Sequence, residues 1–449
     1  MMLFRIVPFF LVACSLSAPA LCEEKFLKVD RQSPLVGLGI NIHTHSSFPS
    51  SLSSIRDAGF NTIRTNIYWN QVEKERGKYD WSNYDRLVQL ARRENIKILF
   101  SVSFSNGIYE DSIKLQSMDG KRTVEKFAPP TSPVGRAAFA KFAAAAAARY
   151  KSLGIIWEIW NEPNYFFFWP PAPDAHSYAQ LAEASCKAIK QADPNAIVIG
   201  PASAGMPSEP GKRTWWTILA SSGAFRCLDG VSVHPYVNNY YKGPEINDEK
   251  YRDLRSLLSL NGHGNLPIIS SEFGYSSYAG GGVSERGQAS LLVRNFLVNL
   301  DSDVGISIWY DWKNDGVEAS DKENNFGINT RSEKPKSGLT AVRTLSRMLR
   351  GMKFTSCRTT DGLIPSKTLY ALRTRGIWSC SFIGNEGRRR VIILWSASQS
   401  TTLLHIPSFS GKAFKVIDVL GKEVPPPARS HLQQIAVGPD PVYAVFDRL

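Results

Sequence analysis

Two glutamates occupy positions in the sequence where they could support acid–base and nucleophilic chemistry. Glu162 follows an apolar run that starts at Ile155, and Glu272 follows another that starts at Leu266. Each run has the length of a β-strand and leads into a loop and then a helical pattern. In a parallel barrel the carboxyl ends of the strands meet at one face, where active sites form. Two carboxylates that face each other there can act as general acid and nucleophile on a glycosidic bond.

Strand-like and helical patterns alternate over residues 35–350, which predicts an α/β fold with a (β/α)8 TIM barrel. The apolar character of the strand runs indicates a sheet that is buried on both faces. Strands are expected at 35–42, 62–68, 97–104, 155–160, 196–200, 230–234, 267–272 and 305–310. Helices are expected at 51–58, 82–94, 133–153, 175–192, 213–219, 248–260, 284–300 and 336–350.

Changes in composition divide the chain into a leader, a catalytic barrel and a C-terminal domain. Residues 1–22 are typical of a signal peptide, with Arg5, an apolar segment and small residues before a cleavage site near Ala20 or Cys22. Lipoprotein cleavage before Cys14 is the alternative. The barrel is expected at 23–351. Residues 352–449 predict a β-sandwich domain, with strand-like runs at 369–373, 391–395, 402–406, 414–419 and 442–446.

Two long connections lie at the face of the barrel where the glutamates are expected. Residues 105–132 form the longest connection, and a loop of this size in such a place is usually functional. The loop after Glu162 contains five consecutive aromatic residues, from Tyr165 to Trp169. We expect Phe168 and Trp169 in this loop to form part of a wall on which sugar rings stack, with packing beneath neighbouring loops as the alternative.

The charge balance restricts the partners of the protein. The chain of 449 residues has a formal net charge of +13, and loss of residues 1–22 removes one charge, which leaves +12 (+13 − 1). A basic protein attracts acidic partners, so an anionic polysaccharide or peripheral attachment to an anionic membrane is expected, with a solvated basic surface as the alternative. No nucleic-acid motif accompanies the basic residues. We expect a monomer without a nucleic-acid partner, located in the periplasm or secreted, with association to the inner membrane left open.

The cysteine content permits disulfides and offers no metal site. Four cysteines follow residue 22, and two fall in each expected domain. Cys186–Cys227 and Cys357–Cys380 are therefore the simplest pairings in an exported protein, with free buried thiols left open. Neither a C-x-x-C motif nor a histidine cluster is present, so no metal or cofactor is expected.

Several motifs together resemble the clan A glycoside hydrolases. They are W-N-E-P at 160–163, H-P-Y at 234–236, the glutamate that ends strand seven, and T-I-R-T-N-I-Y-W-N-Q-V-E at 62–73. The likeness extends over residues 35–350 in order. Within the clan the chain resembles family 39 and the family-39-like endoglycosidases of bacterial exopolysaccharide operons. The resemblance implies a retaining enzyme on a (β/α)8 barrel.

The resemblance also implies roles for individual residues. Glu162 would be the general acid/base and Glu272 the nucleophile. Asn161 would bond the 2-hydroxyl of the sugar, and Tyr236 and Arg64 would position Glu272 and keep it ionised. The sequence alone also suggests that Arg64 pairs with the deeper, buried Glu158.

Further positions follow from the same resemblance, with some departures. His234 would line the site near the acid/base, and Trp309 would form the floor beneath the cleaved sugar, a task that Trp312 or Asp311 could share. Many clan members carry a histidine at the end of strand three, where Phe104-Ser105-Asn106 stands here, so either Asn106 is the substitute or that subsite differs. His43 and His45 follow strand one and are further candidates for substrate contact.

We therefore expect an exported, retaining, endo-acting glycoside hydrolase that cuts a bacterial exopolysaccharide, as in biofilm matrix turnover. An exo-acting glycosidase such as a β-xylosidase is the alternative within the same class. A polysaccharide-binding or assembly protein without turnover is the alternative outside it, although a pure binder has no need of two carboxylates. A transglycosidase shares the covalent intermediate and stays open.

Overall fold

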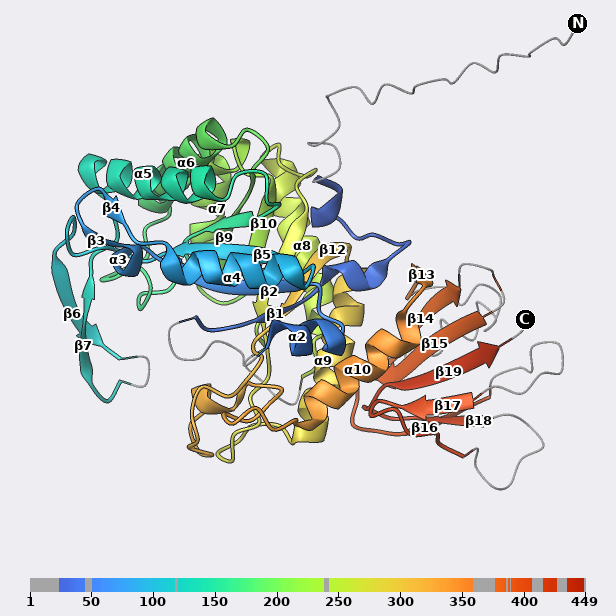
Figure 1. Cartoon of the computed structure of the whole chain (residues 1–449). Helices are drawn as coiled ribbons and strands as arrows, with labels where there is room; N and C mark the ends of the chain where they lie inside the picture. Colours follow the sequence, from blue (N-terminus) through green and yellow to red (C-terminus); the bar gives the residue numbers. More distant parts are fainter. Residues whose placement is uncertain are drawn as a thin grey trace, which may run out of the picture.

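The computed structural model describes residues 24–44, 51–117, 120–237, 242–357, 376–384, 387, 389–405, 415–425 and 434–447. Within these ranges eight parallel strands form a closed barrel, and antiparallel sheets lie beside it (Figure 1). The expected (β/α)8 fold is confirmed. The order around the barrel is β1 (Leu38–Asn41), β2 (Thr62–Tyr68), β5 (Lys97–Ser103), β8 (Ile156–Ile159), β9 (Ile197–Ala204), β10 (Gly230–His234), β11 (Ile268–Phe273) and β12 (Val304–Trp309), which pairs with β1.

Helices connect consecutive strands and cover the outside of the barrel. Their observed ends agree with the expected ranges to within a few residues. Ser132, Asp174 and Ser284 each cap a helix by accepting a backbone N–H with a side-chain oxygen, which satisfies groups that the first turn leaves unpaired. The helices are α2 (Leu52–Ala58), α3 (Trp69–Val72), α4 (Ser82–Arg93), α5 (Pro133–Arg149), α6 (Ala175–Ala192), α7 (Arg213–Ser221), α8 (Ile246–Leu260), α9 (Glu285–Asp301) and α10 (Ser337–Leu349), with short 3-10 turns η1 (Glu24–Leu27), η2 (Pro34–Gly37), η3 (Ala224–Arg226) and η4 (Glu323–Asn325).

The interior of the barrel changes from apolar to polar toward the carboxyl ends of its strands. An apolar cluster fills the lower part and includes Leu99, Ile156, Ile199, Ile269, Ile306 and Ile308. Buried polar side chains follow above it, among them Asn41, Arg64, Ser101, Glu158, Ser232 and His234. Buried polar and charged groups are costly unless they bond to one another. The upper layer must therefore be a connected network, and it surrounds the expected active site.

The long connection at 105–132 contains an antiparallel hairpin. β6 (Ser112–Gln116) and β7 (Thr123–Phe127) pair antiparallel and extend beyond the barrel (Figure 1). This connection was expected to be a loop, although S-I-K-L-Q alternates polar and apolar residues with the period of a strand. A smaller hairpin, β3 (Glu73–Glu75) with β4 (Lys78–Tyr79), follows α3.

The C-terminal region forms two antiparallel sheets. The larger has the order β13 (Met352–Ser356), β14 (Ile377–Gly384), β15 (Arg389–Ser396), β19 (Val442–Asp447) and β17 (Lys415–Asp418), and the smaller pairs β16 (Thr402–His405) with β18 (Gln434–Val437). Side chains of both sheets share an apolar cluster, so the sheets form two layers. Four expected runs fall in β15, β16, β17 and β19, and the run at 369–373 lies outside the described residues. The signal peptide at 1–22 also lies outside them, so the three-part division of the chain stays a prediction.

Covalent and polar contacts hold the fold together. Disulfides join Cys186 to Cys227 and Cys357 to Cys380, which confirms the simplest pairing. Between the barrel and the C-terminal sheets, Glu245 accepts two bonds from Arg294 at 2.8 and 2.7 Å and one from the Trp395 indole at 2.7 Å. A half-buried carboxylate with three donors fixes the segment that precedes α8 against β15.

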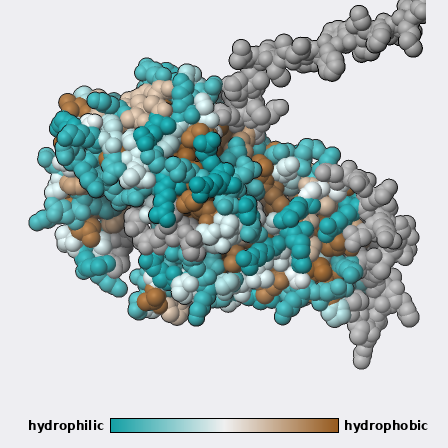
Figure 2. Space-filling model, in the orientation of Figure 1, coloured by the Kyte–Doolittle hydropathy of each residue, from teal (hydrophilic) through white to brown (hydrophobic). Residues whose placement is uncertain are grey.

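The described surface is mainly hydrophilic. The face in Figure 2 shows hydrophobic side chains in small groups between polar ones. Across the described part of the chain, no helix combines the length and apolar character needed to cross a lipid bilayer.

Candidate active site

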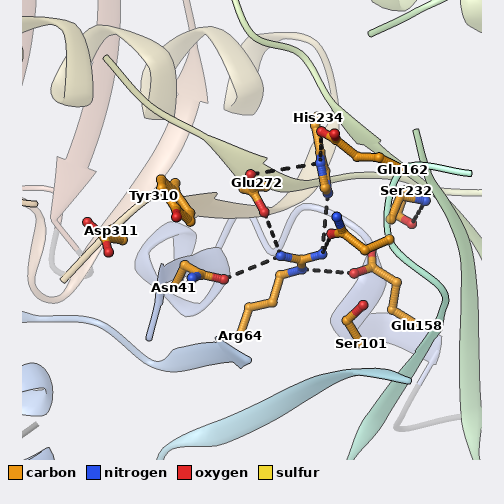
Figure 3. Close-up of polar contacts among 12 residues, drawn as sticks. Asn41, Arg64, Ser101, Glu158, Glu162, Ser232, His234, Glu272, Tyr310 and Asp311 are labelled. Atoms are coloured by element: carbon orange, nitrogen blue, oxygen red, sulfur yellow. Dashed lines mark hydrogen bonds and ion pairs between the residues drawn. The ribbon is translucent and has the colours of Figure 1, made fainter. Parts of the chain in front are cut away.

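The two glutamates identified in the sequence lie close together at the ends of β8 and β11. His234, at the end of β10, lies between them: its Nδ1 is 2.8 Å from Oε1 of Glu162 and 3.9 Å from Oε1 of Glu272 (Figure 3). One oxygen of each glutamate and one ring nitrogen of His234 are all within 4.8 Å of one another. The side chains of Glu162 and Glu272 are 13% and 15% exposed. Both carboxylates therefore reach the same space at the mouth of the barrel.

Left-handed backbone turns Glu162 into the mouth. Trp160 and Glu162 have φ angles of 70° and 48°, a region that residues with a Cβ atom adopt rarely. Trp160 consequently packs outside the barrel against α5, and Asn161 points into the interior. The backbone N–H of Glu162 donates to the carbonyl of Ala202 at 2.9 Å, which holds the turn. Glu158, Trp160 and Glu162 therefore do not share one face of a strand, because the strand ends at Ile159.

An irregularity in β11 turns Glu272 inward. Ile269 belongs to the barrel interior and Ser270 faces Tyr251 on α8, so strict alternation would direct Glu272 outward. The pairing of β11 with β12 changes register between Ser270 and Phe273. Such a bulge re-aims the side chain that follows it. Periodicity in the sequence gives no sign of this bulge.

Arg64 on β2 connects the carboxylates beneath the mouth. It is 1% exposed, and its Nε donates to Glu158 at 2.8 Å. Nη1 donates to Oε2 of Glu272 at 2.8 Å and to Asn41 at 3.3 Å, and Nη2 donates to Oδ1 of Asn161 at 2.8 Å. The guanidinium thus has both of the partners expected from the sequence, the buried Glu158 and the candidate nucleophile. Its fixed fork of donors sets the relative position of these four side chains.

The surroundings of Glu272 stabilise its ionised form. Burial by itself would raise the pKa of Glu272, but His234, Arg64 and the Tyr236 hydroxyl together lower this pKa below its usual value. The Tyr236 hydroxyl donates to Oε1 of Glu272 at 2.8 Å. Burial and the adjacent Glu272 raise the pKa of Tyr236 well above its usual value, so Tyr236 remains a donor. A carboxylate with these donors is ionised at neutral pH.

The contacts of His234 determine its tautomer. Nε2 lies 3.4 Å from Nη2 of Arg64, and a guanidinium can only donate. Nε2 must therefore accept, and the proton resides on Nδ1, from which it is donated to Glu162. The Nδ1–H group of His234 thereby orients Glu162.

The expected role of Trp309 is wrong. Ile306 and Ile308 point into the barrel, so Trp309 points outward, where it is 2% exposed and packs 5.9 Å from the ring of Phe273. The strand was placed correctly, but the sequence does not reveal which of two adjacent aromatic residues faces inward. Tyr310 takes the inward position and lies beside Glu272 in Figure 3.

Trp169 and Asn106 are structural as well. Trp169 is 1% exposed and packs between Trp160 and Tyr178, at ring distances of 5.3 and 5.9 Å, so it has no face left for a sugar. Asn106 is 3% exposed, and its side chain bonds to the backbone of Glu73 at 2.7 Å and of residue 108 at 3.0 Å. Both expectations of substrate contact are wrong, since the groups are used inside the protein.

Phe168 is half-buried and stacks on Phe104 with ring centroids 5.5 Å apart. His43 lies at the mouth after β1, where its Nε2 is 3.4 Å from Asp311 and 3.3 Å from Asp315. His45 lies outside the described residues. In the described part of the chain, His43 with these aspartates and Glu162 with His234 and Glu272 are the groups whose ligand atoms come close enough to hold a metal ion. Arg64 and Tyr236 already occupy oxygens of the second group, which disfavours a metal there.

Comparisons with known proteins agree with this geometry. The family model described as Cellulase (glycosyl hydrolase family 5) matches residues 33–316. The chain belongs to this glycosyl hydrolase family. The expected resemblance to clan A is thereby confirmed.

Individual relatives of this glycoside hydrolase cover the chain to different extents. A β-xylosidase of Geobacillus stearothermophilus is 30% identical over 137 residues, which is 27% of this chain and only 26% of that relative. A family 39 glycoside hydrolase from Bacteroides cellulosilyticus WH2 shares the fold with a TM-score of 0.72, at 23% identity, over 93% of this chain and 82% of that one. A monomeric β-xylosidase from Caulobacter crescentus CB15 does so with a TM-score of 0.64, at 16% identity, over 94% and 97%.

Proposed function

We propose that this glycoside hydrolase cleaves a bacterial exopolysaccharide inside the chain, with retention of configuration, by a double displacement on Glu272 and Glu162. The observation that carries the proposal is the pair of carboxylates on the shared His234, with oxygens within 4.8 Å of one another. Retaining enzymes hold their carboxyl groups about 5–5.5 Å apart, whereas inverting enzymes need about 6.5–9.5 Å to admit a water molecule.

In the first step the ionised Glu272 attacks the anomeric carbon. Glu162 gives its proton to the glycosidic oxygen as that bond breaks, and an ester forms between the sugar and Glu272. In the second step Glu162, now ionised, takes a proton from water, whose oxygen attacks the anomeric carbon and releases Glu272. Asn161 is held by Arg64 at the level of the two carboxylates, which suits a bond to the 2-hydroxyl.

An aromatic row supports action inside a polysaccharide chain. Adjacent rings lie 6.1 Å apart for Tyr68 and Phe104, 5.5 Å for Phe104 and Phe168, 5.3 Å for Phe168 and Phe167, and 6.5 Å for Phe167 and Phe166. Phe166 is 36% exposed. The row begins near the mouth and extends along the loop that follows the acid/base, so it lies on the side where the leaving sugars must be. Exo action needs no platform of this length on that side.

The amine of Lys126, on β7, keeps this row in place. Its Nζ lies 3.4 Å from the centre of the Phe167 ring and donates to the carbonyl of Phe167 at 3.0 Å. Burial lowers the pKa of Lys126 to about 8. The hairpin of β6 and β7 thereby braces the aromatic loop from outside.

The test uses purified exopolysaccharides and product sizing. We expect wild-type protein to release oligomers from mid-chain cuts. Glu272→Gln and Glu162→Gln should remove most activity while the folded structure is retained, as checked by circular dichroism. Azide should restore turnover to Glu272→Gly by occupying the space of the lost carboxylate, with inverted product. Full activity of Glu272→Gln would contradict the mechanism.

Exo action is the second candidate, because a β-xylosidase of Geobacillus stearothermophilus is 30% identical to this chain over 137 residues. Release of monosaccharide in the same assay, without shortening of the polymer, would select it. Binding without any change in polymer size would instead favour a polysaccharide-binding protein.

We further propose that the protein is exported to the periplasm or beyond and acts as a monomer. Support comes from Arg5 and the apolar segment after it, and from disulfides, which persist in oxidising compartments. Mass spectrometry of the native N-terminus separates cleavage near Ala20 or Cys22 from a lipid on Cys14. An intact Met1 on cytoplasmic protein would contradict export.

A further inference from the structure

We propose that one end of the active-site mouth binds the ammonium group of an amino sugar, which makes an unacetylated amino sugar the unit that becomes attached to the nucleophile. The proposal rests on the glycoside hydrolase function given above. The binding groups are Asp311 and Asp315, called here the acidic corner, and His43 contacts both.

The acidic corner lies where the reacting sugar must extend. Glu162 must be next to the glycosidic oxygen, so the leaving group occupies its side of the mouth. The ring that reacts with Glu272 therefore extends to the opposite side. Figure 3 shows Tyr310 and Asp311 on the side of Glu272 that faces away from Glu162. The charge of Glu272 also contributes to raising the pKa of His43, which places the corner within electrostatic reach of the nucleophile.

Asp311 has a buried oxygen without a protein partner. The residue is 2% exposed, and its Oδ1 has no hydrogen bond to any described residue. Its Oδ2 lies 3.4 Å from Nε2 of His43, longer than the ~2.7–2.9 Å of a charge-assisted hydrogen bond. Burial, with a further contribution from Asp315, raises the pKa of Asp311 to about 7. A cation supplied by a ligand would satisfy the oxygen and favour its ionised form.

The balance of charge at the corner favours a cationic ligand. Within the described chain, the ion pairs of Asp311 and Asp315 both go to His43, so two carboxylates share one imidazole. Lys336 acts on Asp311 only at longer range, because its Nζ is held by the carbonyl of Gly327 at 2.6 Å. A hydroxyl can donate one bond here without adding charge, whereas an ammonium brings three donors and a positive charge.

This conclusion differs from the anionic substrate that the net charge suggested. The net charge of +13 describes the whole chain, but selection of a sugar depends on the groups next to it. A uronic acid at this position would bring a third carboxylate beside Asp311 and Asp315, and like charges repel. An N-acetylated sugar lacks the charge and adds bulk.

The test compares matched aryl glycosides that differ in one substituent. Amino, hydroxyl, N-acetyl and uronate forms of glucosides and galactosides, as both anomers, are assayed near neutral pH and again above the pKa of the amine. We expect kcat/KM for the amino sugar to exceed that for its neutral counterpart by about tenfold, as for one added charge-assisted bond. The uronate should fall below the neutral sugar. The preference should disappear at the higher pH.

Variants link the preference to the acidic corner. Asp311→Asn and Asp315→Asn should each bring the ratio of amino to neutral sugar toward one. Asp303→Asn is the matched control: it removes a negative charge at the opposite, exposed end of the same strand, in a left-handed conformation (φ 56°) that asparagine adopts well. It should keep the preference. Melting temperatures identify any variant that fails to fold, in which case the other aspartate variant carries the test.

The outcomes separate the two proposals. If neutral glycosides are cleaved without preference for the amino sugar, or with preference for the uronate, the amino-sugar proposal is overturned and the glycoside hydrolase function is not. No turnover of any glycoside or polysaccharide overturns the proposed function. Equilibrium dialysis with Zn²⁺ tests whether the acidic corner binds a metal ion instead. If Zn²⁺ binds to wild-type protein and not to Asp311→Asn, and the preference for the amino sugar is absent, the acidic corner is a metal site and the inference is overturned.

Discussion

Replacement of Tyr236 by phenylalanine should move the acidic limb of the pH–activity profile to higher pH. The Tyr236 hydroxyl donates to Oε1 of Glu272 at 2.8 Å, and it helps to lower the pKa of the nucleophile. A hydrogen bond to a charged group contributes about 1.5–3 kcal/mol. One pKa unit corresponds to about 1.4 kcal/mol, so loss of this bond should raise the pKa of Glu272 by about 1–2 units.

The sign follows from which form of Glu272 reacts. Only the ionised carboxylate attacks, so activity falls on the acidic side as Glu272 takes up a proton. The acidic limb of the kcat/KM profile should therefore move to higher pH by about 1–2 units in Tyr236→Phe, since that limb reports the free enzyme. The assay is initial-rate hydrolysis of an aryl glycoside across the pH range in which the protein stays folded.

Tyr251→Phe is the matched control for this experiment. It removes a buried hydroxyl that bonds to Asn299 at 3.0 Å, on the outer side of the barrel and away from the carboxylates. It should change stability without moving the acidic limb. An acidic limb that stays in place in Tyr236→Phe, or that moves equally in both variants, would refute the assignment of Tyr236 to Glu272.

Three further predictions concern the aromatic loop, a disulfide and the domain contact. Trp169→Ala should lower the free energy of unfolding by about 3–5 kcal/mol in urea titrations, because it leaves a cavity in a buried site. Phe166 is exposed, so Phe166→Ala should leave stability nearly unchanged and weaken polysaccharide binding by about 1 kcal/mol. The reverse pattern would place the sugar contact at Trp169. Reduction of Cys186–Cys227, with a sequence separation of 41, should lower the free energy of unfolding by about 3–4 kcal/mol, and no change on adding reductant would exclude the bond. Trp395→Phe removes the indole donor to the half-buried carboxylate of Glu245 and should increase hydrogen exchange at residues 242–246. An unchanged exchange pattern would contradict this.

The periodicity of the chain was sufficient to predict the fold. Apolar runs such as that of β2 have the length and bounding turns of a buried strand, and helix starts such as Ser132-Pro133 have local caps. These signals are local, so they can be recognised without knowing which segments of the chain pack against them. The hairpin of β6 and β7 had an equally local signal, the alternation in S-I-K-L-Q, but it was read as part of a loop.

The direction of side chains at the strand ends could not be predicted in the same way. The inward turn of Glu162 depends on left-handed backbone, and that of Glu272 depends on a bulge defined by pairing with β12. The choice of Tyr310 over Trp309 has the same origin, because a shift of one residue moves a side chain to the other face of a strand.

The sequence by itself placed two glutamates at the ends of barrel strands, and its resemblance to clan A implied that Arg64 and Tyr236 keep Glu272 ionised and that His234 lies near Glu162. The strand positions follow from local patterns, because the carboxyl ends of all strands in a parallel barrel meet at one face. Only the tertiary structure decided which groups are free to meet a substrate. Trp169 and Asn106 are used up inside the protein, while Asp311 is left with an oxygen that no described residue satisfies. Exposure and hydrogen-bond partners come from segments far apart in the chain, and no local pattern records them.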